Sequence, residues 1–138
     1  MLSRGCSGII QVVNKKGPEL VKAIPILRMF DVAKARAFYL DYLGFKVDFE
    51  HRFHDNAPLF MGISRGDVVL YLSEHHGDGT PGTHVLIETD GLDALHAELK
   101  AKNYRYMNPG IQVQEWGRRD LIVLDPFGNN INFSERIE

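Results

Sequence analysis

Four side chains that commonly ligate metals lie within five consecutive residues, Glu74-His75-His76-Gly77-Asp78. Adjacent residues of a strand point to opposite faces, so His75 and His76 could converge on one ion only in a loop. Residues 74–82 contain three glycines and one proline and show no hydrophobic periodicity. This composition favours a solvated linker, in which Asp and Gly form turns, rather than a metal site.

A second chemistry, ligand binding by stacking and charge, is suggested by the single tryptophan, Trp116, and by the carboxylates Asp48 and Glu50. Carboxylates attract cations, and aromatic faces stack on flat rings. One aromatic pair contributes only about 0.5–1.5 kcal/mol beyond its buried area. Micromolar binding requires about 8 kcal/mol. A planar, cationic ligand would therefore need a groove that covers most of its surface.

The chain repeats itself with a period of about sixty residues, which indicates paired structural units. Residues 24–27 and the amphipathic run after Asp31 correspond to residues 84–87 and the run after Gly91. Residues 71–74 correspond in the same way to residues 132–135. The duplication predicts two similar half-sheets with a cleft between them.

Each repeat predicts a strand, a helix and three further strands. In the first, we expect strands at 23–29, 45–53, 59–64 and 68–73, and a helix that begins after Asp31 and ends at Gly44. In the second, we expect strands at 83–89, 121–124 and 131–133, and a helix from Asp90 or Gly91 to Asn103. Residues 104–117 are irregular, with room for one short strand. The predicted fold is α+β, with two paired βαβββ modules forming a curved mixed sheet around a cleft.

Strand alternation sorts side chains between the core and the cleft. Hydrophobic alternation sends Phe49, Leu70, Leu72 and Ile87 inward and turns their neighbours, including Asp48 and Glu50, toward the cleft. Arg118, Arg119 and Asp120 follow Trp116, and the sequence leaves open which of them turns inward. The candidate ligand contacts are Trp116, Tyr71, His84, Asn132, Asp48, Glu50 and Asp120.

Composition and charge narrow the function classes. The 138 residues are 44% hydrophobic and 25% charged with a formal charge of −2, which argues against a basic nucleic-acid binder. No apolar stretch is long enough to span a bilayer. The single cysteine, Cys6, cannot form an intrachain disulfide and fits a cytoplasmic protein. We expect no nucleic-acid or membrane partner.

The domain organisation follows from the same pattern. Residues 1–21 are expected to be a leader that is disordered or adds one extra strand. Residues 22–138 are expected to form a single domain. It contains module one at 22–74, a linker at 75–82 and module two at 83–136.

Two motifs resemble the vicinal oxygen chelate superfamily, which includes glyoxalases, ring-cleaving dioxygenases and bleomycin-resistance proteins. The first is Phe38-Tyr39 followed by Leu43-Gly44-Phe45, and the second is the run Asp125-Pro126-Phe127-Gly128-Asn129. The resemblance spans roughly residues 23–135. The run Glu115-Trp116-Gly117 is most similar to the bleomycin-resistance branch. This resemblance implies the glyoxalase/bleomycin-resistance fold and an intertwined homodimer with two shared grooves that binds a bleomycin-like ligand without changing it.

The resemblance also locates the positions from which superfamily enzymes take metal ligands, here Ile24, Tyr71, His84 and Asn132. Isoleucine offers no lone pair, asparagine is a weak ligand, and a phenol with a pKa near 10 rarely ionises. We therefore expect no bound metal or other cofactor and favour a metal-free, dimeric small-molecule binding protein. The alternative is a metal-dependent lyase or dioxygenase, motivated by His84 and by the His75-His76 pair.

Overall fold

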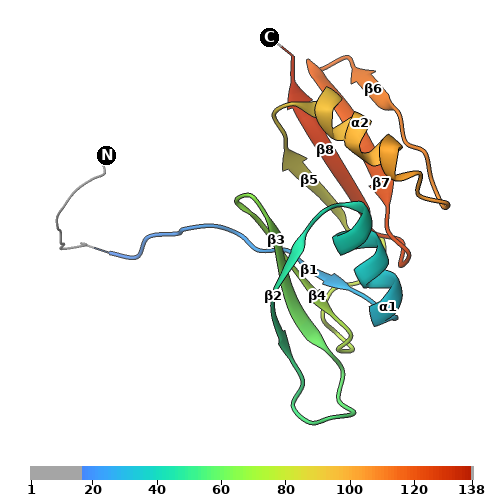
Figure 1. Ribbon diagram of the computed structural model, residues 1–138. Helices are drawn as coiled ribbons and strands as arrows, with labels where there is room; N and C mark the ends of the chain where they lie inside the picture. The colour runs from blue at the N-terminus through green and yellow to red at the C-terminus, as the bar shows by residue number, and fades with distance from the viewer. Residues whose placement is uncertain (1–16, 138) are drawn as a thin grey trace.

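The computed structural model describes residues 17–137, and two modules of one topology are visible in Figure 1. The first contains β1 (Ile26–Arg28), α1 (Val32–Ala35), η1 (Arg36–Tyr42), β2 (Lys46–His51), β3 (Phe60–Arg65) and β4 (Val68–Ser73). The second contains β5 (His84–Glu88), α2 (Leu92–Lys102), β6 (Ile111–Gln114), β7 (Arg118–Leu124) and β8 (Asn130–Arg136).

Each module forms one mixed four-stranded sheet. Sheet A has the order β1-β4-β3-β2, and sheet B has the order β5-β8-β7-β6. The pairs β1–β4 and β5–β8 are parallel, and the remaining pairs are antiparallel. The predicted α+β fold of two βαβββ modules is confirmed, as two four-stranded sheets.

The first helix begins as predicted and then changes type. The Lys34 backbone N–H donates to Asp31 Oδ1 at 3.0 Å, so Asp31 caps α1. From Arg36 onward the segment η1 is a π-helix, in which the backbone N–H of Leu43 reaches the carbonyl of Phe38, five residues back. The sequence predicted an ordinary α-helix here. Gly44, with φ of 77°, ends the segment in the left-handed conformation.

The second helix is capped from a distant strand. Its N-cap, Gly91, has no side chain, and Glu135 Oε2 on β8 accepts the backbone N–H groups of Gly91 at 2.9 Å and Leu92 at 3.3 Å. Asn103 ends α2 in the predicted left-handed conformation, with φ of 51°. Glu135 therefore ties the start of α2 to the last strand of sheet B.

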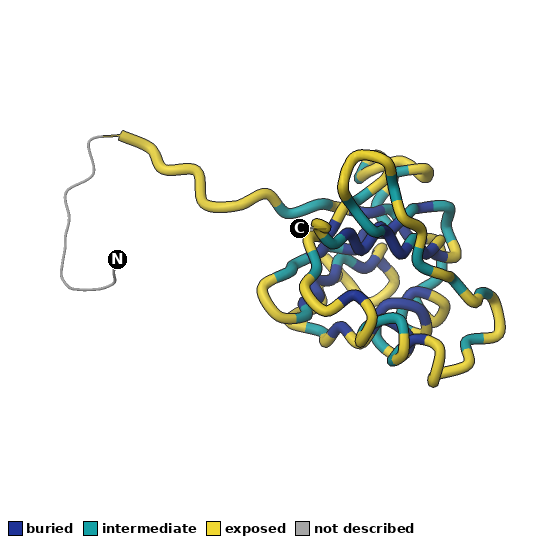
Figure 2. The backbone as a smooth tube through the Cα atoms, turned by 90° about the horizontal axis from the view of Figure 1, so that it is seen from above, coloured by how far each residue is buried: buried dark blue, intermediate teal, exposed yellow. Residues whose placement is uncertain are grey.

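One hydrophobic core joins the two modules, and in Figure 2 the buried segments lie at the centre of the body. It contains Phe38 from η1, Leu72 from β4, Leu99 from α2 and Ile131 from β8. The core and helices cover one face of each sheet. We call the other face of each sheet its open face.

The turn between β7 and β8 is organised by Asp125. Its Oδ1 accepts the backbone N–H groups of Phe127 and Asn129, each at 2.8 Å. Asn129 Nδ2 in turn donates to the Arg28 carbonyl at the end of β1, at 3.2 Å. The second sequence motif therefore connects module two to the first strand of module one.

Residues 17–21, the described part of the segment expected to be a leader, form no strand and project from the body in Figures 1 and 2. Leu20 on this segment is 98% exposed. Cys6 and the rest of residues 1–16 lie outside the described residues. Within residues 17–137, no helix combines the length and apolar character needed to cross a bilayer.

Candidate ligand-binding faces

Three aromatic side chains gather on the open face of sheet A. The ring centroid of Tyr71 lies 5.4 Å from that of Phe49 and 5.3 Å from that of Phe60, and the Phe49 and Phe60 centroids are 6.1 Å apart. Gly62 pairs with both Phe49 and Tyr71, and a Cβ at Gly62 would overlap the Phe49 ring. Glycine at this position therefore lets Phe49 lie flat against the sheet beside Tyr71.

A β-bulge creates this arrangement. Val47 pairs with Ile63 and Phe49 with Gly62, which leaves Asp48 as the extra residue. Simple alternation predicted Phe49 in the core and Glu50 in the cleft, and both expectations are wrong. The bulge turns Phe49 to the open face, where it is 39% exposed, and turns Glu50 to the helix side, where it pairs with Arg36 of η1.

Asp48 stays on the open side, engaged by two donors. Its Oδ1 accepts from Lys46 Nζ at 2.8 Å and from Ser64 Oγ at 3.1 Å. The hydrogen bond from Lys46, and then that from Ser64, lowers the pKa of the Asp48 carboxyl. Asp48 is therefore a paired carboxylate.

The open face of sheet B carries a buried polar network. Asp120 is only 5% exposed, and its carboxylate accepts from Ser134 Oγ at 2.7 Å and from Gln114 Nε2 at 3.3 Å. Arg118 Nη1 donates to Ser134 Oγ at 3.1 Å, and its Nη2 pairs with Glu88 on β5. The structure thus settles the orientation that the sequence left open: Arg118 and Asp120 face the open side.

Arg119 points the other way, toward the helices. Its guanidinium pairs with Asp93 of α2 at 3.0 Å and with Glu135 at 2.5 Å. Both carboxylates raise the pKa of Arg119 above its usual value. Arg119 is therefore part of the helix cap rather than of the open face.

Three further candidates lie on or beside sheet B. Asn132 is central on β8 and 4% exposed, and its Oδ1 is buried without a hydrogen-bond partner among the described residues. His84 begins β5, where it is exposed and pairs with Asn130. Trp116 lies in the turn between β6 and β7 and is 69% exposed.

The structure places five of the seven candidates on the two open faces. Tyr71 and Asp48 share the open face of sheet A, whereas the other sheet carries His84, Asn132 and Asp120. Trp116 lies at the end of sheet B, and Glu50 lies on neither open face. Sequence reasoning missed Phe49 and Phe60 and left the orientation of Arg118 open. Alternation from Gly62 and Ser64 could have assigned Phe60 to the open face, whereas the bulge gave no local signal for Phe49.

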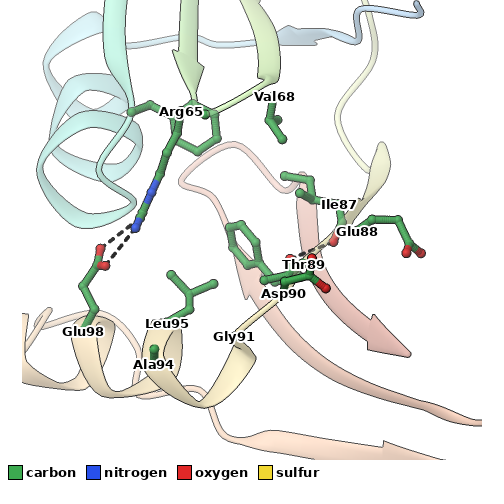
Figure 3. Close-up of a pocket in the computed structure, with 13 residues that line it drawn as sticks. Arg65, Val68, Ile87, Glu88, Thr89, Asp90, Gly91, Ala94, Leu95 and Glu98 are labelled. Atoms are coloured by element: carbon green, nitrogen blue, oxygen red, sulfur yellow. Dashed lines mark hydrogen bonds and ion pairs between the residues drawn. The ribbon is translucent and has the colours of Figure 1, made fainter. Parts of the chain in front are cut away.

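The chain also contains hollows on the helix side. One of about 430 Å³ lies between the β3–β4 hairpin, the end of β5 and the start of α2 (Figure 3). Arg65 spans it to Glu98, with nitrogen–oxygen distances of 2.8 and 2.9 Å, and this pairing lowers the pKa of Glu98. A second, of about 470 Å³, lies between the first helix and Tyr104, Tyr106 and Met107. Neither hollow is lined by any of the seven candidates.

The metal-ligating side chains singled out in the sequence have other contacts. Asp78 accepts from Ser73 Oγ at 2.8 Å, and Glu74 accepts from the Leu59 backbone N–H at 2.9 Å. The His75 ring meets Phe53 and Phe60 edge-on, at 6.0 and 6.5 Å between centroids. Across residues 17–137, no three His, Cys, Asp or Glu side chains come together in a way that could hold a metal ion.

Two βαβββ modules in one chain, each with one open sheet face, are a fold shared by the members of one protein superfamily. Residues 12–138 match the family model described as glyoxalase superfamily protein. The chain therefore belongs to the glyoxalase/bleomycin-resistance superfamily, as its two motifs suggested.

Its similarity extends to individual bleomycin resistance and bleomycin-binding proteins. The chain is 28% identical over 137 residues to a bleomycin resistance protein of Geobacillus stearothermophilus, which covers 86% of this chain and 99% of that protein. The bleomycin-binding protein of the bleomycin-producing Streptomyces verticillus, solved as a complex with copper(II)-bleomycin, is 32% identical. That match covers 85% of this chain and 97% of that chain, with a TM-score of 0.62.

A third structure is similar in fold alone. It is a glyoxalase-related enzyme from Clostridium phytofermentans, 20% identical, with a TM-score of 0.67. The match covers 89% of this chain and 100% of that chain. Binding proteins and a glyoxalase-related enzyme thus share this fold, so a function has to be argued from the side chains on the open faces.

Proposed function

We propose that this chain is a dimeric, metal-free binding protein of the bleomycin-resistance type, which sequesters a planar, antibiotic-like small molecule without changing it chemically. The observation that carries the proposal is the partly exposed aromatic cluster Phe49, Phe60 and Tyr71 on the open face of sheet A. Flat rings stack on such a surface. The single cysteine, Cys6, supports a cytoplasmic setting.

The proposed groove needs two subunits. Within one chain, the aromatic cluster belongs to sheet A, whereas Asn132 and Asp120 belong to sheet B, and the two hollows described above contain none of them. Pairing the open face of sheet A with that of sheet B from a second copy would cover both and create two grooves per dimer. The exposed apolar segment around Leu20 and Val21 supports the same pairing, since it offers a second copy additional contact area.

Asn132 supports a polar contact in that groove. A buried acceptor without a donor costs about 1–3 kcal/mol. A ligand or partner group with an N–H or O–H near Asn132 Oδ1 would remove that cost. Tyr71, His84, Asp48, Asp120 and Trp116 remain candidate contacts around the groove, whereas Glu50 is not retained because it faces the helices.

Fluorescence titration with bleomycin tests the proposal, because Trp116 is the only tryptophan. We expect saturable quenching at two ligands per dimer, a dimer in sedimentation equilibrium, and bleomycin of unchanged mass after release. Phe49→Ala should weaken binding about tenfold, since it removes about 1.4 kcal/mol or more of stacking and burial. Tyr106→Ala, an exposed aromatic on the helix side, is the matched control and should bind normally.

The same protein preparations also test the alternative function, that of a metal-dependent enzyme. Stoichiometric metal in tag-free protein, together with chemical conversion of the ligand, would support a metal-dependent lyase or dioxygenase instead. A monomer at micromolar concentration would contradict the shared grooves.

A further inference from the structure

The charges that the strands place on the open faces differ from those that the sequence suggested. Register assigns six charged side chains to these faces, and the hydrogen bond from Ser64 places a seventh, the bulge residue Asp48, beside them. The carboxylates are Asp48, Glu88 and Asp120, and the cations are Arg28, Lys46, Arg118 and Arg136. Four cations against three carboxylates give a net charge of +1 with histidines neutral. The carboxylates Asp48 and Glu50 suggested a surface that attracts cations, whereas the two open faces together carry a slight positive charge.

Each of the three carboxylates already has a hydrogen-bond or ion-pair partner within the chain. Asp48 accepts from Lys46 and Ser64, and Glu88 pairs with Arg118. Asp120 is buried and accepts hydrogen bonds from Ser134 and Gln114. A ligand cation would have to displace one of these partners before it could reach a carboxylate.

Two of the cations form no ion pair within residues 17–137. The guanidinium of Arg28 lies 4.6 Å from the centroid of Phe30, and its Nε is buried without an acceptor. Arg136 ends β8 opposite Arg118 and is exposed. The two like charges of Arg118 and Arg136 lie directly opposite each other, which is unfavourable for a cation arriving at the same place.

The unpaired polar atoms on the open faces suggest which groups a ligand should carry. Asn132 Oδ1 on sheet B lacks a donor, and Arg28 Nε on sheet A lacks an acceptor. Both atoms are buried in the single chain, so a ligand reaches them where the side chains that cover them move aside. An amide supplies both an N–H and a C=O group. Together with the aromatic cluster, these atoms favour a flat molecule with amide-type edges.

We infer that the ligand of the open faces is a planar molecule that is neutral or singly anionic and carries amide-type donors and acceptors, rather than a polycation. The inference rests on the proposed function, because it specifies the ligand class of the same grooves. It departs from the cationic ligand that the sequence suggested.

Three planar probes that share one ring system test it by calorimetric titration: acridone, which is neutral with an N–H and a C=O; acridone-4-carboxylate, an anion; and 9-aminoacridine, a cation. We expect both acridones to bind about tenfold more tightly than 9-aminoacridine, a difference of about 1.4 kcal/mol. The difference should shrink as salt is raised from about 0.01 to 0.15 M, because screening shortens the reach of the arginine charges.

Arg136→Gln removes one of the unpaired cations and breaks no ion pair among the described residues. It should raise the affinity for 9-aminoacridine about threefold and leave that for acridone unchanged, as expected for a partly screened charge. Arg105→Gln is the matched control, because it removes the same charge from the exposed loop after α2, away from the open faces. It should change neither affinity.

The possible outcomes distinguish a failure of this inference from a failure of the proposed function. Preferred binding of 9-aminoacridine, or equal effects of Arg136→Gln and Arg105→Gln, would overturn the inference while leaving the proposed function in place. If neither bleomycin nor any of the three probes bound, the proposed function would fall and the inference with it.

Discussion

Tyr39 Oη donates a hydrogen bond to Asp125 Oδ2 at 2.6 Å, across 86 positions of sequence, in the buried core. The two residues belong to the two sequence motifs, one in the first helix of module one and the other in the last turn of module two. Asp125 Oδ2 also accepts from Asn129 Nδ2 at 2.9 Å. The motifs therefore act together, by fixing how the two modules, and with them the two open faces, are oriented in one chain.

Tyr39→Phe should lower the free energy of unfolding by about 1–3 kcal/mol, since it removes a buried hydrogen bond to a carboxylate. Urea denaturation followed by circular dichroism measures the change. Tyr106→Phe is the control, because the Tyr106 side chain is exposed and its loss of a hydroxyl should leave stability within about 0.5 kcal/mol. Equal effects of the two substitutions would mean that the bond to Asp125 contributes nothing.

Alkaline pH should destabilise the protein through the same tyrosine. Burial, then the Asp125 charge, then the hydrogen bond raise the pKa of Tyr39 well above its usual value. Above about pH 10 the unfolded chain loses a proton that the folded chain keeps, so stability present at lower pH declines with a limiting slope of about 1.4 kcal/mol per pH unit. In denaturation series from pH 8 to pH 11, Tyr39→Phe should show a shallower decline than the parent, and an identical slope would contradict this origin.

Acid should act on a different contact, between Glu135 and the start of α2. The hydrogen bond from Arg119, followed by those from the Gly91 and Leu92 backbone N–H groups, lowers the pKa of Glu135. A lowered pKa stabilises the fold above the unfolded value of about 4.3, and that contribution is lost as pH falls through the folded value. Glu135→Gln should flatten the stability profile below about pH 5, whereas Glu115→Gln in the exposed β6–β7 turn should leave it unchanged.

Local sequence signals predicted the parts of the fold that local chemistry decides. The Asp31 cap and the left-handed residues Gly44 and Asn103 follow from side chains or backbone freedom at those positions, and the structure has all three. The sixty-residue repeat predicted two similar half-sheets, and the two sheets have equivalent strand orders. These features need no knowledge of distant contacts.

Features set by distant partners could not be predicted in this way. The bulge at Asp48 depends on the register between β2 and β3, so alternation assigned Phe49 and Glu50 to the wrong faces. The π-helical turn of η1 and the cap that Glu135 provides to α2 likewise depend on tertiary packing. Alternation assigned the candidate contacts on β4, β5 and β8 to the open side correctly, because no bulge interrupts those strands.

The bulge leads to a prediction for Gly62, the residue that pairs with Phe49. Alanine there would push the exposed Phe49 ring away from Tyr71, because the added Cβ overlaps that ring, yet a half-exposed side chain can swing outward. We therefore expect Gly62→Ala to fold with a loss of about 1 kcal/mol, the low end of the cost of overpacking, but to bind bleomycin and the planar probes more weakly. Gly110→Ala is the matched control, since a Cβ at Gly110 meets nothing within 4 Å and its φ is not in the left-handed region. If Gly62→Ala kept full affinity while folding normally, the aromatic cluster of sheet A would not be the stacking surface.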